Sequence, residues 1–337
     1  MLRIYFGRFF WVIFICTASF GTNFSYAEQV VVYSARIEKL IKPMFDSFTK
    51  ETGIPVKFVT DEAGVLLAKL RAEGKYTPAD MLITTDAGNL WEAVQEGLLA
   101  PVESEKLEVN IPSYLRDPQK KWFGLSVRAR TIVYNTDKVN PAELSTYEDL
   151  ANPKWQGRIC LRTSKKVYNQ SLVAMMIAEH GKEKTEQIVS GWVSNLAVDP
   201  LSNDTQAMEF VAAGKCDVTI VNTYYYGHLI EKNPNLPLAI FWPNQNGSGV
   251  HVNISGAGIT KNTKNKKSAV MLLEFLSSKK AQRLFSDINM EYPVNPKVSP
   301  DSIVAAWGSF KQNKMNLVKA GELQTEAVKL MDRADYR

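Results

Sequence analysis

Residues 30–96 alternate between short apolar runs typical of strands and longer runs with apolar residues at helical spacing. In residues 38–52, for example, Ile41, Met44, Phe45 and Phe48 share one helical face, and Gly53 follows as a stop. Such alternation is typical of a parallel sheet with helices on both faces. We predict strands over 30–33, 54–60 and 80–84, and helices over 38–52, 63–73 and 89–96.

A second α/β set follows and predicts a second lobe. Residues 125–135 alternate apolar and polar side chains like a long strand, which makes them a natural crossing out of the first lobe. Residues 250–260 are again strand-like and are a candidate return crossing. Between and after the crossings we predict strands over 158–163 and 216–221, and helices over 171–180, 204–213 and 269–285.

The fold class predicted from this pattern is α/β, as a two-lobed clamshell with hinge crossings between the lobes. The expected N-terminal lobe comprises residues 28–127 and 251–301, and the expected C-terminal lobe comprises 128–250 and 302–337. The expected arrangement resembles the periplasmic-binding-protein fold.

The first 27 residues have the features of a secretory signal peptide. Arg3 and Arg8 precede an apolar core from Phe9 to Cys16, and Ser25-Tyr26-Ala27 supplies small residues ahead of Glu28. The apolar core is too short to span a bilayer, and no later run approaches the roughly 20 residues that a transmembrane helix needs. We therefore expect residues 1–27 to be removed on export and the mature chain to lack a transmembrane segment.

Two cysteines remain once the signal is excluded, Cys160 and Cys216. In an oxidising compartment a pair of cysteines usually forms a disulfide, and each of these two belongs to a predicted strand. The sequence therefore predicts the bond Cys160–Cys216. Two buried free thiols are the alternative.

Tyrosines follow both of these strands. Tyr224, Tyr225 and Tyr226 come directly after the apolar run 216–221, and Tyr168 lies between the strand-like run 158–163 and the helical run 171–180. Ligands of α/β sheets bind at the carboxyl ends of the strands, so these phenols are candidate ligand-binding groups. The alternative is that they pack in the core and hydrogen-bond to the backbone.

Signatures of competing functions are absent from the sequence. It has no nucleophile-elbow, P-loop, dinucleotide-binding or zinc-protease motif, and its three histidines show no zinc spacing. The formal net charge of +5 includes Arg3 and Arg8, and no Lys/Arg run suggests nucleic-acid binding. We predict a binding protein and not an enzyme.

Several separate segments of the chain match the pattern of one known family. These segments are Val32-Tyr33-Ser34-Ala35-Arg36, Pro78-Ala79-Asp80, Trp122-Phe123-Gly124, Tyr168-Asn169-Gln170-Ser171-Leu172-Val173, Asn203-Asp204, Asn222-Thr223-Tyr224-Tyr225 and Val252-Asn253-Ile254-Ser255-Gly256. Taken together they resemble the periplasmic ferric-ion-binding proteins of ABC iron importers, and the resemblance covers nearly all of the chain after the signal.

The resemblance implies a set of metal ligands. The tyrosines that bind iron in this family match Tyr168, Tyr224 and Tyr225, whereas Tyr226 has no metal role by this match. The arginine that supports the site after the Trp-Phe-Gly segment matches Arg128.

The chain departs from the family pattern in its first loop. Members that take a histidine or tyrosine ligand there carry it where this chain has Ile37 and Glu38. Other members complete the coordination with an exogenous anion such as carbonate, held by the arginine that matches Arg36. We therefore expect an anion-assisted site, with Glu38 as a direct ligand or a supporting residue in the alternative.

The function implied is capture of Fe³⁺ as a transported ligand in the periplasm and its delivery to an ABC transporter inner-membrane permease. We expect a monomer with no nucleic-acid partner. Two alternatives stay open from the residues alone. One is a clamshell protein for a polyamine, thiamine or an oxyanion, and the other is a secreted hydrolase.

Overall fold

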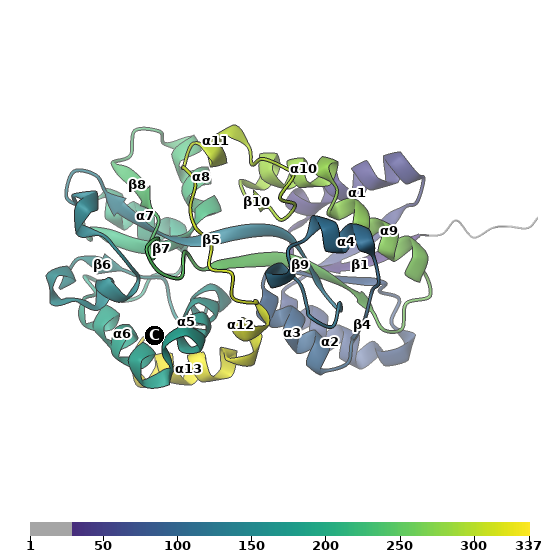
Figure 1. Ribbon diagram of the computed structural model, residues 1–337, viewed down its shortest axis with the longest axis horizontal. Coiled ribbons are helices and arrows are strands. Elements are labelled where there is room, and N and C mark those ends of the chain that lie inside the picture. The colour runs from purple at the N-terminus through teal and green to yellow at the C-terminus, as the bar shows by residue number, and fades with distance from the viewer. Residues whose placement is uncertain (1–28) are drawn as a thin grey trace, which may run out of the picture.

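The computed structural model describes residues 29–337, which form a long mixed sheet with helices packed along it (Figure 1). The predicted signal peptide, residues 1–27, lies outside the described residues. The sheet begins with β1 (Val30–Ser34), paired in parallel with β2 (Val56–Thr60) and β3 (Met81–Thr84). The connecting helices are α1 (Glu38–Thr52), α2 (Ala63–Glu73) and α3 (Ala87–Gln95). The α1 and α2 bounds are those predicted from sequence.

The parallel pairing predicted for the strands of residues 30–96 is confirmed, but the sheet as a whole is mixed. Strand β9 (Val252–Thr260) lies between β3 and β5 (Phe123–Asn135) and is antiparallel to both. The strand order is β2-β1-β3-β9-β5-β7-β6. Strand β9 lies in the middle of the first sheet because the chain returns there from the second lobe.

Strand β5 belongs to both halves of the molecule. Phe123 to Ala129 pair with β9, whereas Arg130 to Tyr134 pair with β7 (Val218–Asn222). Figure 1 shows β5 running through the centre from one lobe to the other. The two-lobed α/β fold with crossing strands is thus confirmed.

The second lobe carries the elements that precede the tyrosines. Strand β6 is only Ile159–Cys160, shorter than the predicted 158–163, and it pairs in parallel with β7. Helix α5 begins at Val167, four residues earlier than predicted, so Tyr168 lies in its first turn. The other elements are α6 (Lys182–Ser194), α7 (Asp204–Ala212), α8 (Thr223–Lys232) and β8 (Leu238–Phe241).

The single helix predicted over 269–285 is wrong. The structure has α9 (Lys266–Leu276) and α10 (Lys279–Asn289), because the Ser278 hydroxyl caps α10 by accepting from the Ala281 N–H at 3.3 Å. The remaining elements are α4 (Glu105–Asn110), α11 (Ser302–Ala305), α12 (Val318–Glu322) and α13 (Gln324–Arg333), with the two-residue strands β4 (Leu99–Ala100) and β10 (Tyr292–Pro293).

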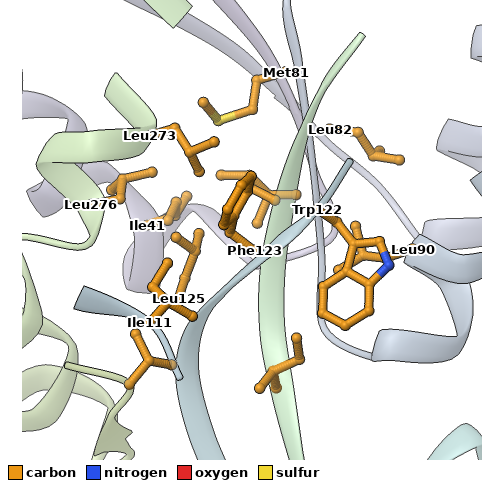
Figure 2. Close-up of a cluster of buried hydrophobic side chains, with 14 of the residues drawn as sticks. Ile41, Met81, Leu82, Leu90, Ile111, Trp122, Phe123, Leu125, Leu273 and Leu276 are labelled. Atoms are coloured by element: carbon orange, nitrogen blue, oxygen red, sulfur yellow. The ribbon is translucent and has the colours of Figure 1, made fainter. Parts of the chain in front are cut away.

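Each lobe has its own hydrophobic core. In the first, the buried Trp122 and Phe123 meet Ile41 from α1, Leu90 from α3 and Leu273 from α9 (Figure 2). Buried residues of this core reach to Leu317 along the chain. In the second lobe, the core residues come from 132–241 and 327–336. The lobe boundaries given above remain predictions.

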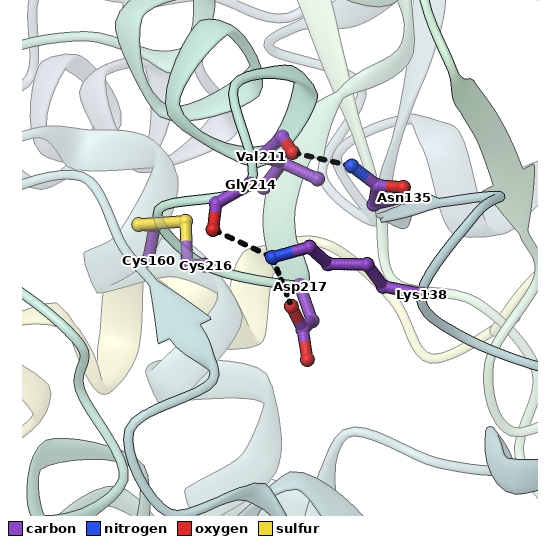
Figure 3. Close-up of a disulfide and its surroundings, with 7 residues drawn as sticks. All are labelled: Asn135, Lys138, Cys160, Val211, Gly214, Cys216 and Asp217. Atoms are coloured by element: carbon purple, nitrogen blue, oxygen red, sulfur yellow. Dashed lines mark hydrogen bonds and ion pairs between the residues drawn. A yellow bond between two sulfur atoms is a disulfide. The ribbon is translucent and has the colours of Figure 1, made fainter.

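The predicted disulfide Cys160–Cys216 is present and joins β6 to the segment leading into β7. Figure 3 shows two more ties around it: Asn135 Nδ2 donates to the Val211 carbonyl, and Lys138 Nζ donates to the Gly214 carbonyl, both at 2.8 Å. These contacts fix the base of the strands that lead to the tyrosine helices. Among the helices of residues 29–337, none has the length and apolar character needed to cross a membrane.

Candidate functional site

Three of the tyrosines meet at the helix starts that follow β6 and β7. Tyr168 lies in the first turn of α5, and Tyr224 and Tyr225 lie in the first turn of α8. Because β6 and β7 are parallel neighbours, their carboxyl ends lie side by side and bring the two helices together. The ring centroids of Tyr224 and Tyr225 are 4.3 Å apart.

These phenols line a cavity of about 600 Å³ between the lobes. The second lobe contributes the three tyrosines, and the first lobe contributes Arg36 and Ile37 from the segment before α1. In residues 29–337, the His, Cys, Asp and Glu side chains form no group of three that could hold a metal ion. The three tyrosines are therefore the candidate metal-ligating groups of this cleft.

The surroundings of Tyr224 and Tyr225 favour the protonated form of both phenols. Burial raises the pKa of Tyr224 well above its ordinary value, and the charges that Tyr168 and Tyr225 would carry raise it further, while Arg128 lowers it. Burial also raises the pKa of Tyr225, followed by the charge on Tyr168. Three phenolates in this space therefore require a cation to offset their mutual repulsion.

Two arginines flank Tyr168. The guanidinium carbon of Arg128 lies 5.1 Å from the centroid of the Tyr168 ring, and that of Arg162 lies 5.4 Å from it. Arg128 is buried, and its Nη1 has no hydrogen-bond partner within residues 29–337. Against the larger effect of burial, which raises both pKa values, Arg128 lowers the pKa of Tyr224 and Arg162 lowers that of Tyr225. Arg128 Nη1 remains a free guanidinium donor near the cleft.

Arg130 ties the two tyrosine helices together. Its Nη2 donates to Asn169 Oδ1 at 2.6 Å, and its Nη1 donates to Asp204 Oδ2 at 2.6 Å and to Asn222 Oδ1 at 3.4 Å. Asn169 follows Tyr168, and Asn222 precedes α8. One buried cation thus fixes the start of both helices. The polar residues Asn169, Asp204 and Asn222 belong to the family-like segments of the sequence, but their roles were not predicted.

Arg36 lines the cleft, and both terminal nitrogens of its guanidinium already have partners, whereas its Nε has none within residues 29–337. Nη2 donates to Glu291 Oε2 at 2.8 Å, and Nη1 donates to Glu291 Oε1 at 3.3 Å and to the hydroxyls of Ser126 and Ser255. Glu291 also lines the cavity. Sequence reasoning missed Glu291, because nothing in the segment around it marks a carboxylate partner for Arg36.

The segment leading into α1 places Ile37 at the cavity and Glu38 away from it. Ile37 lines the cavity with its side chain largely exposed, and it offers no ligand atom. Glu38 is the first residue of α1, is exposed, and is not among the residues that line the cavity. The structure therefore brings Arg36, Arg128 and the three tyrosines together and places Glu38 outside this group.

Tyr226 points away from the group. Its ring is buried against Trp307, with centroids 5.9 Å apart, and its hydroxyl donates to the Leu238 carbonyl at 3.3 Å. A side chain at the next residue, Gly227, would collide with Met290 and Trp307. Glycine at this position lets α8 pack closely against Met290 and Trp307, and the Tyr226 ring is buried in the same contact.

Three known proteins are similar to this chain over most of its length. The Iron uptake protein A1 of Synechocystis sp. is 43% identical over 316 residues, which cover 92% of this chain and 88% of that protein. The solved structure of the Trichodesmium IdiA (FutA) protein in complex with iron and citrate ligands has a TM-score of 0.89 and 43% identity, covering 92% of this chain and 100% of that one. The Fe(3+)-binding periplasmic protein of Serratia marcescens is 28% identical, covering 92% of this chain and 93% of that protein.

These relatives confirm the resemblance to periplasmic ferric-ion-binding proteins that the sequence segments indicate. The model of the family described as bacterial extracellular solute-binding protein matches residues 77–306. A match over most of the chain, together with a relative 43% identical over 92% of it, is sufficient to assign the family. The chain belongs to the bacterial extracellular solute-binding protein family.

Proposed function

We propose that this protein binds ferric iron in the periplasm through the phenolates of Tyr168, Tyr224 and Tyr225 and delivers it to an ABC permease. The observation that carries the proposal is the convergence of three phenols from two helix starts in one cavity between the lobes. The iron-related names of the relatives support it.

The chemistry of the three phenols suits Fe³⁺. A small trivalent ion is hard and prefers anionic oxygen, by the same matching that assigns carboxylates to hard divalent metals. Three phenolates supply three negative charges and cancel the charge of the ion. Because burial raises the pKa of both Tyr224 and Tyr225, iron must displace their protons, and affinity falls as the pH falls.

Three phenolates leave an octahedral ion about half coordinated, and we propose that an exogenous carboxylate or carbonate completes the site. Ile37 has no ligand atom, and Glu38 lies outside the residues lining the cavity, which favours an anion over a fourth protein ligand from the first loop. The free Nη1 of Arg128 is a donor for that anion. Arg36 becomes a second donor if its hydrogen bonds to Glu291 break.

Lobe closure provides the signal for the permease. The tyrosines belong to the second lobe and Arg36 to the first, so an iron–anion pair bridges the cleft between them. The crossings β5 and β9 are continuous strands, which suit a hinge that bends and does not slide. A permease can then distinguish the loaded, closed form from the empty, open one.

The test is to purify the protein without chelators and measure its metal content and visible absorption. Phenolate bound to ferric iron gives a broad visible band, so we expect about one iron per chain and a coloured protein. A colourless protein that ignores added Fe³⁺ but binds a polyamine, thiamine or an oxyanion would reject the proposal in favour of another solute.

A second measurement addresses the anion. Ferric affinity is determined by chelator competition in carbonate-free buffer with and without bicarbonate, for the native protein, Arg36→Ala and Glu38→Gln. We expect bicarbonate to tighten native binding, Arg36→Ala to reduce that gain because Arg128 alone then remains as a donor, and Glu38→Gln to retain it. Indifference to every anion, together with a large loss in Glu38→Gln, would make Glu38 the fourth ligand.

A further inference from the structure

Asp86 is a fully buried carboxylate at the point where the first lobe meets the second. It follows β3 and caps α3, with Oδ1 accepting from the Gly88 N–H at 2.8 Å. Capping occupies one oxygen and is done equally well by serine or asparagine elsewhere in proteins. The rest of the carboxylate makes contacts that a helix cap does not need.

These additional contacts reach both crossing strands and the other lobe. Oδ2 accepts from Asn253 Nδ2 on β9 at 2.9 Å and from Arg128 Nη2 on β5 at 3.4 Å. The hydroxyl of Ser171, on α5 of the second lobe, donates to the Asp86 carboxylate and lies 3.0 Å from Oδ2 and 3.2 Å from Oδ1. One carboxylate therefore joins a first-lobe helix, two hinge strands and a second-lobe helix.

Two of these partners lead directly to Tyr168. Ser171 lies three residues after Tyr168 in α5, and side chains three apart on a helix share a face. Arg128 has its guanidinium over the Tyr168 ring. Asp86 thus restrains both the helix that carries this phenol and the cation beside it.

The surrounding packing makes this junction stiff. A side-chain carbon at Gly88 would lie 2.5 Å from Gln324 Oε1, and one at Gly321 on α12 would lie 2.4 Å from Trp91 on α3. Gln324 Nε2 in turn donates to Gln170 Oε1 on α5 at 3.1 Å. In Figure 1, α12 lies between α3 and α5. The two helices joined by Asp86 are thus also held together through α12 and the start of α13.

We propose that Asp86 is a positioning residue for the metal site: through Ser171 and Arg128 it fixes Tyr168 relative to the first lobe, so that the phenol is in place before the ligand arrives. This inference rests on the proposed function. Its physical basis is preorganisation, because a ligand group held in its bound position needs no ordering on binding. Asp86 itself is not among the residues that line the cavity, so it has no role as a metal ligand in this proposal.

A double-mutant cycle tests the link. Ferric affinity is measured by chelator competition for the native protein, Asp86→Asn, Ser171→Ala and the double variant. Asparagine keeps an acceptor for the Gly88 N–H, but its amide cannot accept from Arg128 and Asn253. We expect each single change to weaken iron binding by roughly tenfold, the scale of one hydrogen bond to a charged group. The loss in the double variant should be smaller than the sum of the two single losses, because both changes act on the same contact.

Controls separate positioning from stability. Thr185→Ala removes a buried second-lobe hydroxyl that donates to the Gly181 carbonyl at 2.7 Å, far from the tyrosines in sequence, and it should leave iron affinity unchanged. Ser171→Thr restores the hydroxyl and should recover most of the affinity. Thermal unfolding of each iron-free variant shows whether a loss of iron binding reflects a loss of folded protein.

The outcomes are distinct. Native iron affinity in Ser171→Ala would overturn the inference, even if its unfolding temperature fell. If Asp86→Asn does not fold, the pair Ser171→Ala and Ser171→Thr decides alone. Failure of the native protein to bind iron would reject the proposed function, whereas native binding with a silent Ser171→Ala would reject only the role of Asp86.

Discussion

Glu291 holds the guanidinium of Arg36 through both carboxylate oxygens, in a pair that is almost fully buried. The two residues come from the first loop and from the turn after α10, yet they meet in the cleft that faces the tyrosines. Glu291 therefore occupies the place on Arg36 that an exogenous anion would take. An anion gripped by Arg36 must compete with a carboxylate that is already there.

Glu291→Gln should increase the effect of bicarbonate on iron binding. The amide removes the charge that competes for Arg36 and keeps a similar shape, so the gain in ferric affinity at a fixed, subsaturating bicarbonate concentration should rise by roughly tenfold. Chelator competition measures it. Glu73→Gln, which alters a carboxylate that accepts from the Tyr33 hydroxyl, is the control. An unchanged or smaller bicarbonate gain in Glu291→Gln would show that Glu291 does not restrict the anion.

Replacing Tyr168, Tyr224 or Tyr225 by Phe should weaken iron binding sharply while the fold persists. Each change removes an anionic ligand from a trivalent ion, so we expect a loss of at least about a hundredfold, more than one charged hydrogen bond contributes. Tyr226→Phe keeps the ring against Trp307 and should be nearly silent. Loss of the visible band in Tyr226→Phe but not in Tyr225→Phe would show that the assignment is one residue out of register.

His251 should make the protein less stable in mild acid. It is buried next to β9, and burial lowers its pKa to about 3, with the charges of Arg128 and Arg130 as further causes. In the unfolded chain the His251 imidazole binds a proton near pH 6.5, whereas in the folded chain it does so only near pH 3. Protonation therefore favours the unfolded chain, and stability is lost as the pH falls through this window. The expected loss is about 2 kcal/mol at pH 5 relative to pH 8.

The check is denaturant unfolding of the iron-free protein across this pH range, compared with His251→Gln. The variant cannot gain the proton on unfolding, so its free energy of unfolding should vary less with pH than that of the native protein. Parallel curves for the two proteins would mean that other groups cause the acid sensitivity.

Removing the disulfide should lower the free energy of unfolding by about 2–4 kcal/mol, since the bond closes a long loop in the unfolded chain. Cys160 and Cys216 are 56 residues apart in sequence. We expect the double change to alanine to match the native protein unfolded in the presence of dithiothreitol. The native protein, denatured without reductant, should show no free thiol. Two titratable thiols would contradict the bond.

Local signals in the sequence were sufficient for much of the fold. Gly53 ends α1 in the left-handed conformation that glycine adopts easily, with its N–H donating to the Thr49 carbonyl, and the prediction of that end was correct. The tyrosines after β6 and β7 were likewise visible, because Tyr224 and Tyr225 follow directly after the apolar run of β7 and Tyr168 lies between β6 and the apolar run of the next helix. The cap at Ser278 was also readable, and overlooking it merged α9 with α10.

Long-range relationships were out of reach. Glu291 is 255 residues from Arg36, and the contact between Asp86 and Ser171 spans 85 residues. A pattern of apolar and polar residues gives no information about which buried charges meet. The same limit explains why the sequence did not predict the direction of β9, since an apolar strand looks alike whether its neighbours run parallel or antiparallel.

The insertion of β9 between β3 and β5 also sets an order in which the chain can fold. Strands β5, β6, β7 and β8 are complete once residue 241 has been made, so the scaffold beneath the tyrosines can assemble early. The first sheet has a gap in its middle until residues 252–260 arrive, and such distant pairing is slow. We expect pulse-labelling hydrogen exchange during refolding to protect β7 before β3, and simultaneous protection would contradict this order. The tyrosine-bearing half of the cleft is then built before the half that closes over it.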